Sequence, residues 1–344
     1  MLISSLEELR LYAPANAIDY IEVLSGFFDS SEHDFLSDKL GSSLHKSLTD
    51  FYRKLRDEEG IGLYIQQITD GDELPPYARL LTVAQRILVF DALGRAIDMQ
   101  AISVNGAGIN MAVADDYRKA DREAVNAYKV TCIKEAHVAL NRLLVLLEEW
   151  AQEEDANEEQ QEIVRLWRDS RYFYLAASLI IPSAKVLQEY MNIYDSRERF
   201  IQMLPDLRFI QEDILAPVIG EDFMDFMVSF SQGNMEETTN DDKPLLARIL
   251  HNLRKATSRY LEARTKVLRV EQDRRTAAHN EAISLTDRLV VCLTFHQSNL
   301  PEKALNAFKS SPLYKEPEQP KQETAPLFEN NAENSVIFVT PTLD

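Results

Sequence analysis

The sequence contains an internal repeat, and this repeat limits the folds that the chain can adopt. Residues 2–12 read LISSLEELRLY and residues 180–190 read IIPSAKVLQEY, with serine, leucine and tyrosine in register. Two further matches follow in the same order: the DFL and LG pairs within 34–41 match DIL and IG within 213–220, and PPYARLL at 75–81 matches PLLARIL at 244–250. Three collinear matches predict a tandem duplication, in which one structural unit is built twice.

The distribution of glycine predicts a mainly α chain. The 344 residues include ten glycines, and only Gly220 and Gly233 lie beyond Gly108, whereas turns and hairpins use glycine heavily. Gly41 and Gly220 each stand between two stretches with apolar residues at helical spacing. We therefore expect a helix, a left-handed glycine corner and a second helix in both copies, which makes two duplicated helical-bundle modules.

Two other segments are defined by where glycine and proline occur. Residues 57–76 contain three glycines and two prolines, which predicts a loop. Residues 245–300 contain neither, and this length is too great for one ordinary helix, so we expect two antiparallel helices that turn near 271–275.

Two segments have the pattern of β-strands. Apolar residues alternate with polar ones on both sides of a glycine-rich turn in residues 101–113, which predicts a β-hairpin. Residues 335–340 form a short strand candidate that can add to a sheet edge in its own chain or in another subunit. We expect both segments to contact neighbouring subunits, through Ile102, Val104, Asn105, Gly106, Ile109, Met111, Val336, Ile337, Phe338 and Val339.

Composition sets the expected boundaries of the modules. Residues 148–162 contain eight acids and no base, and residues 310–334 are rich in proline, lysine, glutamate and glutamine. We therefore expect a first helical module with the hairpin at 1–150, an acidic linker at 151–163, a second helical module at 164–309, and a flexible tail at 310–344 that ends in the strand at 335–340.

The charge of the chain limits its partners. Lysine and arginine number 37 against 56 aspartates and glutamates, giving a net charge of -19, so the protein should repel DNA and anionic membranes. One stretch has the opposite sign, and we expect either a basic contact face or a solvated helix surface there. Its members are Arg248, Arg254, Lys255, Arg259, Arg264 and Arg269. No apolar run is long enough to span a membrane, and acids at 7 and 8 argue against a signal peptide.

The residue patterns of the common catalytic sites are absent from the sequence. It has no HExxH, no glutamate three residues before a histidine, no Gly-Lys-Ser/Thr and no complete dinucleotide fingerprint. Cys292 and His296 lie one helical turn apart with Asp287 nearby, which leaves a thiol hydrolase as a minor alternative. We expect no enzymatic activity, no metal and no cofactor, and we expect Cys132 and Cys292 to be buried packing residues.

The order of these motifs resembles the head-tail connector, or neck adaptor, proteins of tailed phages. The first copy carries LISS-x-x-x-L-x-x-Y, then Leu40-Gly41 between two helices, then the hairpin and a long helix. The second copy, with SR-x-x-F from Ser196 and P-x-IG from Pro217, is similar to an uncharacterised family in phages and prophages of Bacteroidetes. The resemblance covers about residues 1–300 and rests on structural motifs.

This resemblance implies a non-enzymatic virion protein, assembled in the host cytoplasm, that forms a ring between portal and tail. The ring would extend the DNA exit channel, contact the portal and other neck or tail proteins, and let DNA pass without specific binding. Contacts between neighbours in such a ring are heterologous. The alternative is a cytosolic all-helical adaptor or regulatory protein whose two lobes bind another protein.

Overall fold

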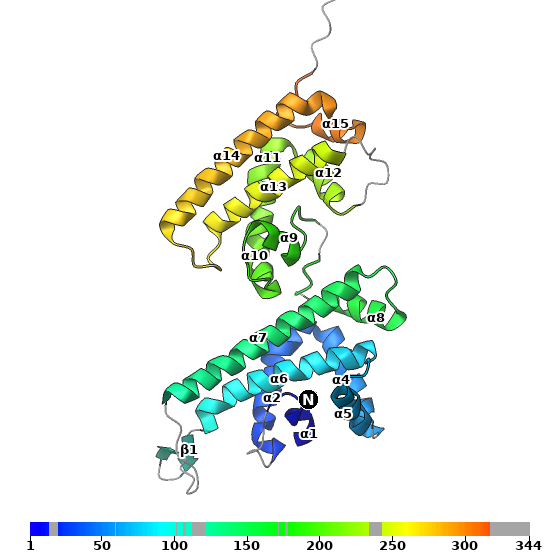
Figure 1. Cartoon of the computed structure of the whole chain (residues 1–344), viewed down its shortest axis with the longest axis vertical. Helices are drawn as coiled ribbons and strands as arrows, with labels where there is room; N and C mark the ends of the chain where they lie inside the picture. Colours follow the sequence, from blue (N-terminus) through cyan, green and yellow to red (C-terminus); the bar gives the residue numbers. More distant parts are fainter. Residues whose placement is uncertain are drawn as a thin grey trace, which may run out of the picture.

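The protein forms two helical lobes stacked along its long axis (Figure 1). This computed structural model describes residues 1–13, 20–58, 60–100, 102–105, 108–111, 122–170, 172–175, 178–233 and 243–316. Helices make up most of these residues, so the prediction of a mainly α chain is confirmed. In the described part of the chain, no helix is long and apolar enough to cross a membrane.

The first lobe is built around a long antiparallel pair, α6 (Pro76–Gln100) and α7 (Arg122–Gln152). A short sheet of β1 (Ile102–Asn105) and β2 (Gly108–Met111) follows α6. The remaining elements are α1 (Leu6–Arg10), the 3-10 helix η1 (Ile21–Leu24), α2 (Ser25–Ser31), the π-helix η2 (Glu32–Leu36), α3 (Ser37–Leu40), α4 (Ser42–Asp57), α5 (Ile61–Asp70) and α8 (Glu158–Trp167).

The second lobe is built around a similar pair, α13 (Lys243–Arg264) and α14 (Gln272–His296). The remaining elements are α9 (Ala184–Tyr190), α10 (Arg197–Phe209), the π-helix η3 (Ile210–Leu215), α11 (Ala216–Ile219), α12 (Glu221–Ser231), the 3-10 helix η4 (Gln297–Asn299) and α15 (Glu302–Phe308). The turn of the long pair lies at 265–271, slightly before the predicted position, because Thr265 and Val270 supply carbonyls that the Arg275 side chain caps.

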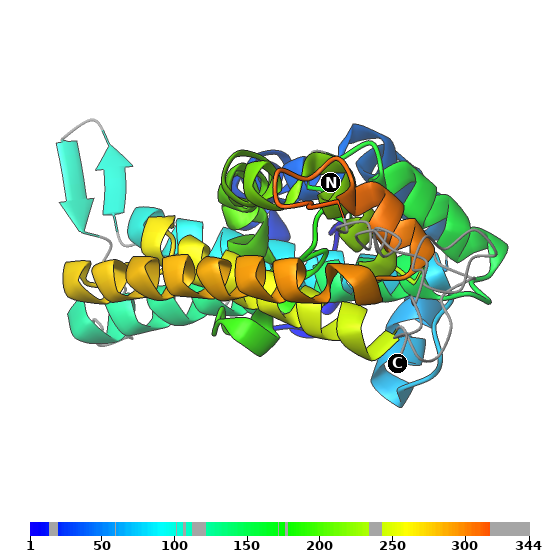
Figure 2. The same ribbon diagram turned by 90° about the horizontal axis from the view of Figure 1, so that it is seen from above.

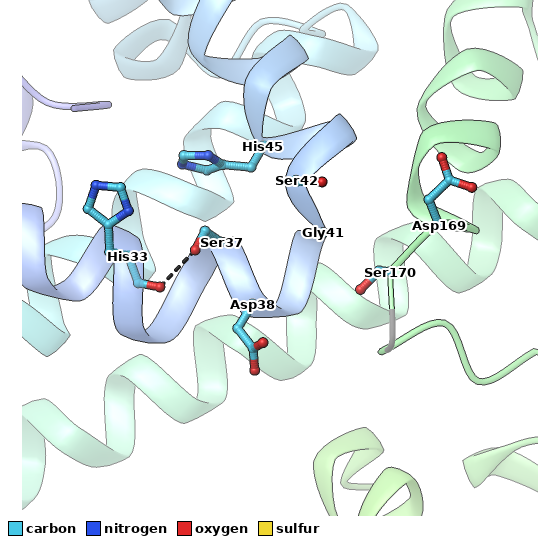
Figure 3. A pocket seen from close by; sticks show the side chains of 8 residues that line it. All are labelled: His33, Ser37, Asp38, Gly41, Ser42, His45, Asp169 and Ser170. Carbon is cyan, nitrogen blue, oxygen red and sulfur yellow. Dashed lines mark hydrogen bonds between the residues drawn. The ribbon is translucent and has the colours of Figure 1, made fainter.

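Both lobes contain the glycine corner that the sequence predicts. Gly41 has φ +80° between α3 and α4, and Gly220 has φ +97° between α11 and α12. A segment from the end of each lobe packs against the corner: Ser170 lies beside Gly41 (Figure 3), and Ser311 lies beside Gly220. Helix–glycine–helix corners are therefore confirmed in both halves, and each is closed by a serine far along the chain.

A second shared contact fixes the start of each lobe. The backbone N–H of Leu2 donates to Glu32 Oε2 at 2.9 Å, and its carbonyl accepts from Gln85 Nε2 at 2.8 Å. In the second lobe, Ile180 N–H donates to Gln211 Oε1 at 2.8 Å, and its carbonyl accepts from Arg254 Nε at 2.9 Å. We call this arrangement the backbone clasp, because side chains from the π-helix and the long helix satisfy both polar groups of one buried residue.

The strands β1 and β2 pair antiparallel, with Ile102 opposite Met111 and Val104 opposite Ile109. The hairpin lies at the end of the α6–α7 pair that is remote from α8 (Figures 1 and 2). Gly106 and the terminal segment 335–340, with Val336, Ile337, Phe338 and Val339, lie outside the described residues.

Three expected loops are more ordered than their composition indicates. Residues 57–76 contain helix α5, because Tyr64 is buried and donates to Gln85 Oε1 at 3.0 Å. The acidic segment 151–163 contains the end of α7 and the start of α8, whose apolar face is buried against α4, α6 and α7. Residues 310–316, the start of the expected tail, pack on the second lobe through Ser311.

The two lobes share one hydrophobic core. Buried apolar residues form a single connected cluster that extends from Leu2 to Phe308. Three aromatic rings link the lobes: Tyr174 packs edge-on against Trp167 of α8 and against Phe200 of α10, with centroid distances of 5.8 Å in both cases. The segment that joins the lobes is therefore part of the core.

Candidate functional site

The lobes meet where the start of α10 lies on α7, and a buried arginine holds this junction. Arg197 Nε donates to Glu148 Oε2 at 3.0 Å, and both side chains are 7% exposed. Arg197 Nη1 also lies 2.7 Å from Asp195 Oδ1, and the Arg197 N–H donates to Asn141 Oδ1 at 2.9 Å. Burial alone would lower the pKa of Arg197, but its bonds to Glu148 and Asp195 raise it, so the guanidinium stays charged.

Tyr174 completes this cluster from the segment between the lobes. Its hydroxyl donates to Glu148 Oε2 at 2.9 Å. Burial, and then the charge of Glu148, raise the pKa of Tyr174 above its ordinary range, so the phenol remains a donor. The carboxylate of Glu148 in the first lobe thus accepts hydrogen bonds from Arg197 in the second lobe and from Tyr174 in the segment between the lobes.

A histidine bond forms the outer edge of the junction. His137 Nδ1 of α7 lies 2.7 Å from Glu198 Oε2 of α10, and the ring of Phe35 meets the imidazole edge-on at 5.6 Å. The hydrogen bond to Glu198 raises the pKa of His137, and burial opposes this shift. The protonated imidazole therefore favours the docked arrangement of the lobes.

A cleft opens beside this junction, and we call it the interlobe cleft. It consists of a cavity of about 740 Å³ that adjoins another of about 600 Å³. The first is lined by Lys134, His137, Val138, Asn141, Arg142, Tyr194, Ser196, Glu198, Arg199, Gln202 and Val267. The second shares Tyr194, Arg199 and Val267 and adds Met191, Asn192, Glu262, Leu268, Arg269, Val270 and Arg274.

The backbone around the interlobe cleft is strained. Tyr194, Asp195 and Arg269 have φ of 59°, 51° and 47°, and they are the only non-glycine residues with positive φ in the described part of the chain. Such conformations cost about 1–3 kcal/mol each and cluster at functional sites. The side chain of Gln188 helps to hold the strained turn, because its Oε1 accepts from the N–H of Asp195 at 3.0 Å. This clustering of strain marks the cleft as the best candidate site.

The cleft is basic, in contrast to the chain as a whole. Lys134, Arg142, Arg199 and Arg269 line it, and none of them forms an ion pair within the residues that the structure covers. The guanidinium of Arg199 lies 4.6 Å from the centre of the exposed Tyr194 ring. These groups can bind carboxylates or phosphates, and the aromatic ring and the valines can pack against an apolar stem.

The predicted basic contact face does not form one surface. Arg254 belongs to the backbone clasp, Arg264 pairs with Asp206 at 2.8 Å, and Arg248 donates to Cys292 Sγ at 3.3 Å. Arg259 lies within 2.7 Å of Glu262 and 3.1 Å of Glu281. Lys255 lines a separate small pocket. Of the six residues, Arg269 alone lines the interlobe cleft, so most of these charges serve the second lobe internally.

Another hollow of about 550 Å³ lies at the first glycine corner (Figure 3). Several of its polar side chains already have partners: Ser37 Oγ donates to the His33 carbonyl at 2.7 Å, and His45 Nε2 lies 3.1 Å from Glu32 Oε1. The described residues contain no cluster of three or more metal-binding side chains. Cys132 and Cys292 are both buried thiols, as expected.

Sequence reasoning did not find the interlobe cleft, because its walls come from α7, α10 and the α13–α14 turn, which are far apart in the chain. The nearest signal in the sequence is the pair Asp195 and Glu198, whose spacing is that of a capping box at the start of a helix. The structure instead caps α10 with Ser196, whose Oγ accepts from the Arg199 N–H at 3.3 Å, and it uses Glu198 to bind His137. Glu198 therefore belongs to the junction through its bond to His137 and not through a helix cap.

Comparison with known proteins gives one partial match. Residues 36–160 match the model of a family of unknown function (DUF6712). No curated protein and no solved structure matches the chain. The match covers most of the first lobe from α3 to the start of α8, and it assigns no activity.

Proposed function

We propose that this chain is a structural protein of the neck of a tailed phage, a ring-forming connector or adaptor between portal and tail. It would act without catalysis or a cofactor, assemble in the host cytoplasm and become part of the virion. The sequence resemblance over about residues 1–300 supports this proposal, and the mainly helical fold is consistent with it.

The observation that carries the proposal is a set of exposed apolar side chains on the free half of α7. Tyr128, Val130 and Ile133 of α7 are 48%, 64% and 41% exposed. They lie on the half of α7 that starts next to the β1–β2 hairpin (Figure 1). Large apolar side chains exposed on several sides of one protruding helix favour a contact with another chain, because their exposure to water is unfavourable. A ring of identical subunits would cover them.

We further propose that the two lobes arose by tandem duplication. The glycine corners and the backbone clasps support this, because each contact recurs at corresponding positions in both lobes. The copies differ at the end of the long helical pair: a hairpin follows α6, whereas a short turn follows α13. On this proposal, the hairpin and the tail at 335–340 make contacts that only one copy needs.

The charge of the chain also suits a channel. A net charge of -19 would repel the phosphates of passing DNA, so the DNA would move through the ring without specific binding. Portal and other neck or tail proteins would be the stable partners.

The assembly state tests this function. Native mass spectrometry and electron microscopy over a range of concentrations should show closed rings, alone or on purified portal rings. Replacing Tyr128, Val130 and Ile133 by serine should prevent ring formation, whereas Val23→Ser, at a similarly exposed apolar residue on η1, should not. A chain that stays monomeric at all concentrations and does not bind portal rings would favour the adaptor alternative.

A further inference from the structure

The bend between α7 and α8 carries a group of exposed acids that lack basic partners in the described part of the chain. We call it the acidic bend and define it by six exposed residues: Glu149, Glu153, Glu154, Asp155, Glu158 and Glu162. None of the six forms an ion pair within the described part of the chain, and no base occurs between residues 148 and 164. The acidic bend thus concentrates six negative charges within 14 residues at neutral pH.

The interlobe cleft offers the complementary charge. Lys134, Arg142, Arg199 and Arg269 lie there without acidic partners, and the two adjoining cavities provide about 740 and 600 Å³ of space. Arginine is well suited to bidentate pairing with carboxylates, and the guanidinium of Arg199 lies 4.6 Å from the centre of the exposed Tyr194 ring. The cleft therefore suits an acidic protein segment.

Within one chain, most of the acidic bend lies away from the cleft. Lys134 of the cleft and the end of α7 at Gln152 are separated by about 27 Å along the helix axis, and the nearest members of the two groups, Arg142 and Glu149, by about 10 Å. In Figure 1 the acidic bend lies to the right, next to α8, while the α13–α14 turn that borders the cleft lies to the left. No ion pair joins the two surfaces within the described part of the chain, so each surface is available to another molecule.

We infer that the interlobe cleft of one subunit receives the acidic bend of a second copy of this chain. Because donor and acceptor surfaces differ, the contact is heterologous and repeats from subunit to subunit, which closes a ring when the rotation allows it. This inference rests on the proposed ring function and specifies the interface that holds the ring together. The left-handed backbone of Tyr194 and Arg269 holds the cleft open for this segment.

A charge-swap experiment tests the contact. The cleft variant Lys134→Glu/Arg142→Glu and the bend variant Glu154→Lys/Asp155→Lys should each dissociate the rings in native mass spectrometry and sedimentation. A chain that carries all four changes should form rings again, because the opposite charges are restored across the interface. Lys46→Glu/Lys54→Glu on α4 changes the net charge equally at exposed positions outside the cleft and should leave the rings intact. Circular dichroism of each variant checks that the helices remain folded.

A covalent test separates the inference from the ring itself. Arg142→Cys/Asp155→Cys should form intermolecular disulfides on mild oxidation, since Cys132 and Cys292 are buried. Rings that persist in both charge-reversal variants, without these cross-links, would overturn the inference but leave the proposed function intact. A wild-type chain that never assembles would overturn both. Loss of portal binding in the cleft variant, with intact rings, would assign the cleft to the portal and also overturn the inference.

Discussion

A Cβ atom on Gly41 would lie 3.0 Å from the Cα of Ser170, and the Gly41 backbone has φ +80°. Two independent constraints thus require glycine at this corner: the left-handed backbone and the close approach of a segment from the end of the lobe. Gly220 and Ser311 are in the same relationship, with a distance of 2.9 Å and φ +97°.

Gly41→Ala and Gly220→Ala should each lower the free energy of unfolding by about 2–4 kcal/mol, through backbone strain and the contact with serine. Gly26→Ala is the matched control, because a Cβ there meets nothing within 4 Å and the residue lies in helix α2. The control should stabilise slightly. Urea unfolding followed by circular dichroism measures all three, and equal effects at Gly41 and Gly26 would contradict the account.

The backbone clasps should give the lobes different responses to acid. Burial raises the pKa of Glu32, but bonds from His45 and the Leu2 N–H outweigh it, so the pKa lies below its ordinary value of 4.5. Glu32 therefore stabilises the first lobe at neutral pH, and this contribution is lost as pH falls below 4.5 through the folded pKa. Gln211, at the same place in the second lobe, does not titrate.

Glu32→Gln should consequently lower stability at pH 7 by about 1–3 kcal/mol and flatten the pH dependence of unfolding in acid. Hydrogen exchange at several pH values would show which lobe opens first. If wild type and variant lose stability in parallel below pH 4.5, the assignment to Glu32 is wrong.

The buried pair of Arg197 and Glu148 should dominate the docking of the lobes. Arg197→Met leaves a buried carboxylate with only Tyr174 as donor and should cost about 3–5 kcal/mol. Arg197→Met/Glu148→Leu should cost less than the sum of the single changes, because neither charge is then left alone. Thermal unfolding of the three variants completes the cycle, and strict additivity would show that the two residues do not interact.

The bond between His137 and Glu198 should make the junction weakly sensitive to pH. The pKa of His137 is raised above 6.5, so its contribution to stability is complete below that pH and is lost as pH rises through the folded pKa. The effect should stay below about 1 kcal/mol, because the side chain is half exposed. NMR titration should show the pKa of His137 falling in Glu198→Gln, and an unchanged titration would exclude this pairing in solution.

The helices and the glycine corners could be predicted from the sequence because they depend on local spacing and on backbone conformation. The prediction of a loop at residues 57–76 was wrong. Glycine and proline indicate only the local backbone preference, whereas α5 is stabilised by a hydrogen bond between Tyr64 and Gln85, which are distant in the sequence. Composition predicted an acidic linker at 151–163, where the structure has the end of α7 and the start of α8, because the apolar face of α8 is carried mainly by Ile163, Val164 and Trp167 at and beyond the end of that segment.

The candidate site was harder to predict than the fold. A run of bases in residues 248–275 suggested a single surface, but a helix distributes consecutive charges around its axis, and Arg254 faces inward to the Ile180 carbonyl. The cations of the interlobe cleft come from α7, α10 and the α13–α14 turn. Their proximity follows from the docking of two lobes, which no local pattern encodes.

The row of rings through Trp167, Tyr174 and Phe200 has a mechanical consequence. A chain with a solvent-exposed, flexible linker between its lobes could bend there without disrupting the packing of buried side chains. Here, bending would separate aromatic rings and expose the buried ion pair of Glu148, so the molecule should behave as a stiff strut. A mechanical force applied to one lobe would therefore be transmitted to the other lobe with little bending at the junction between them.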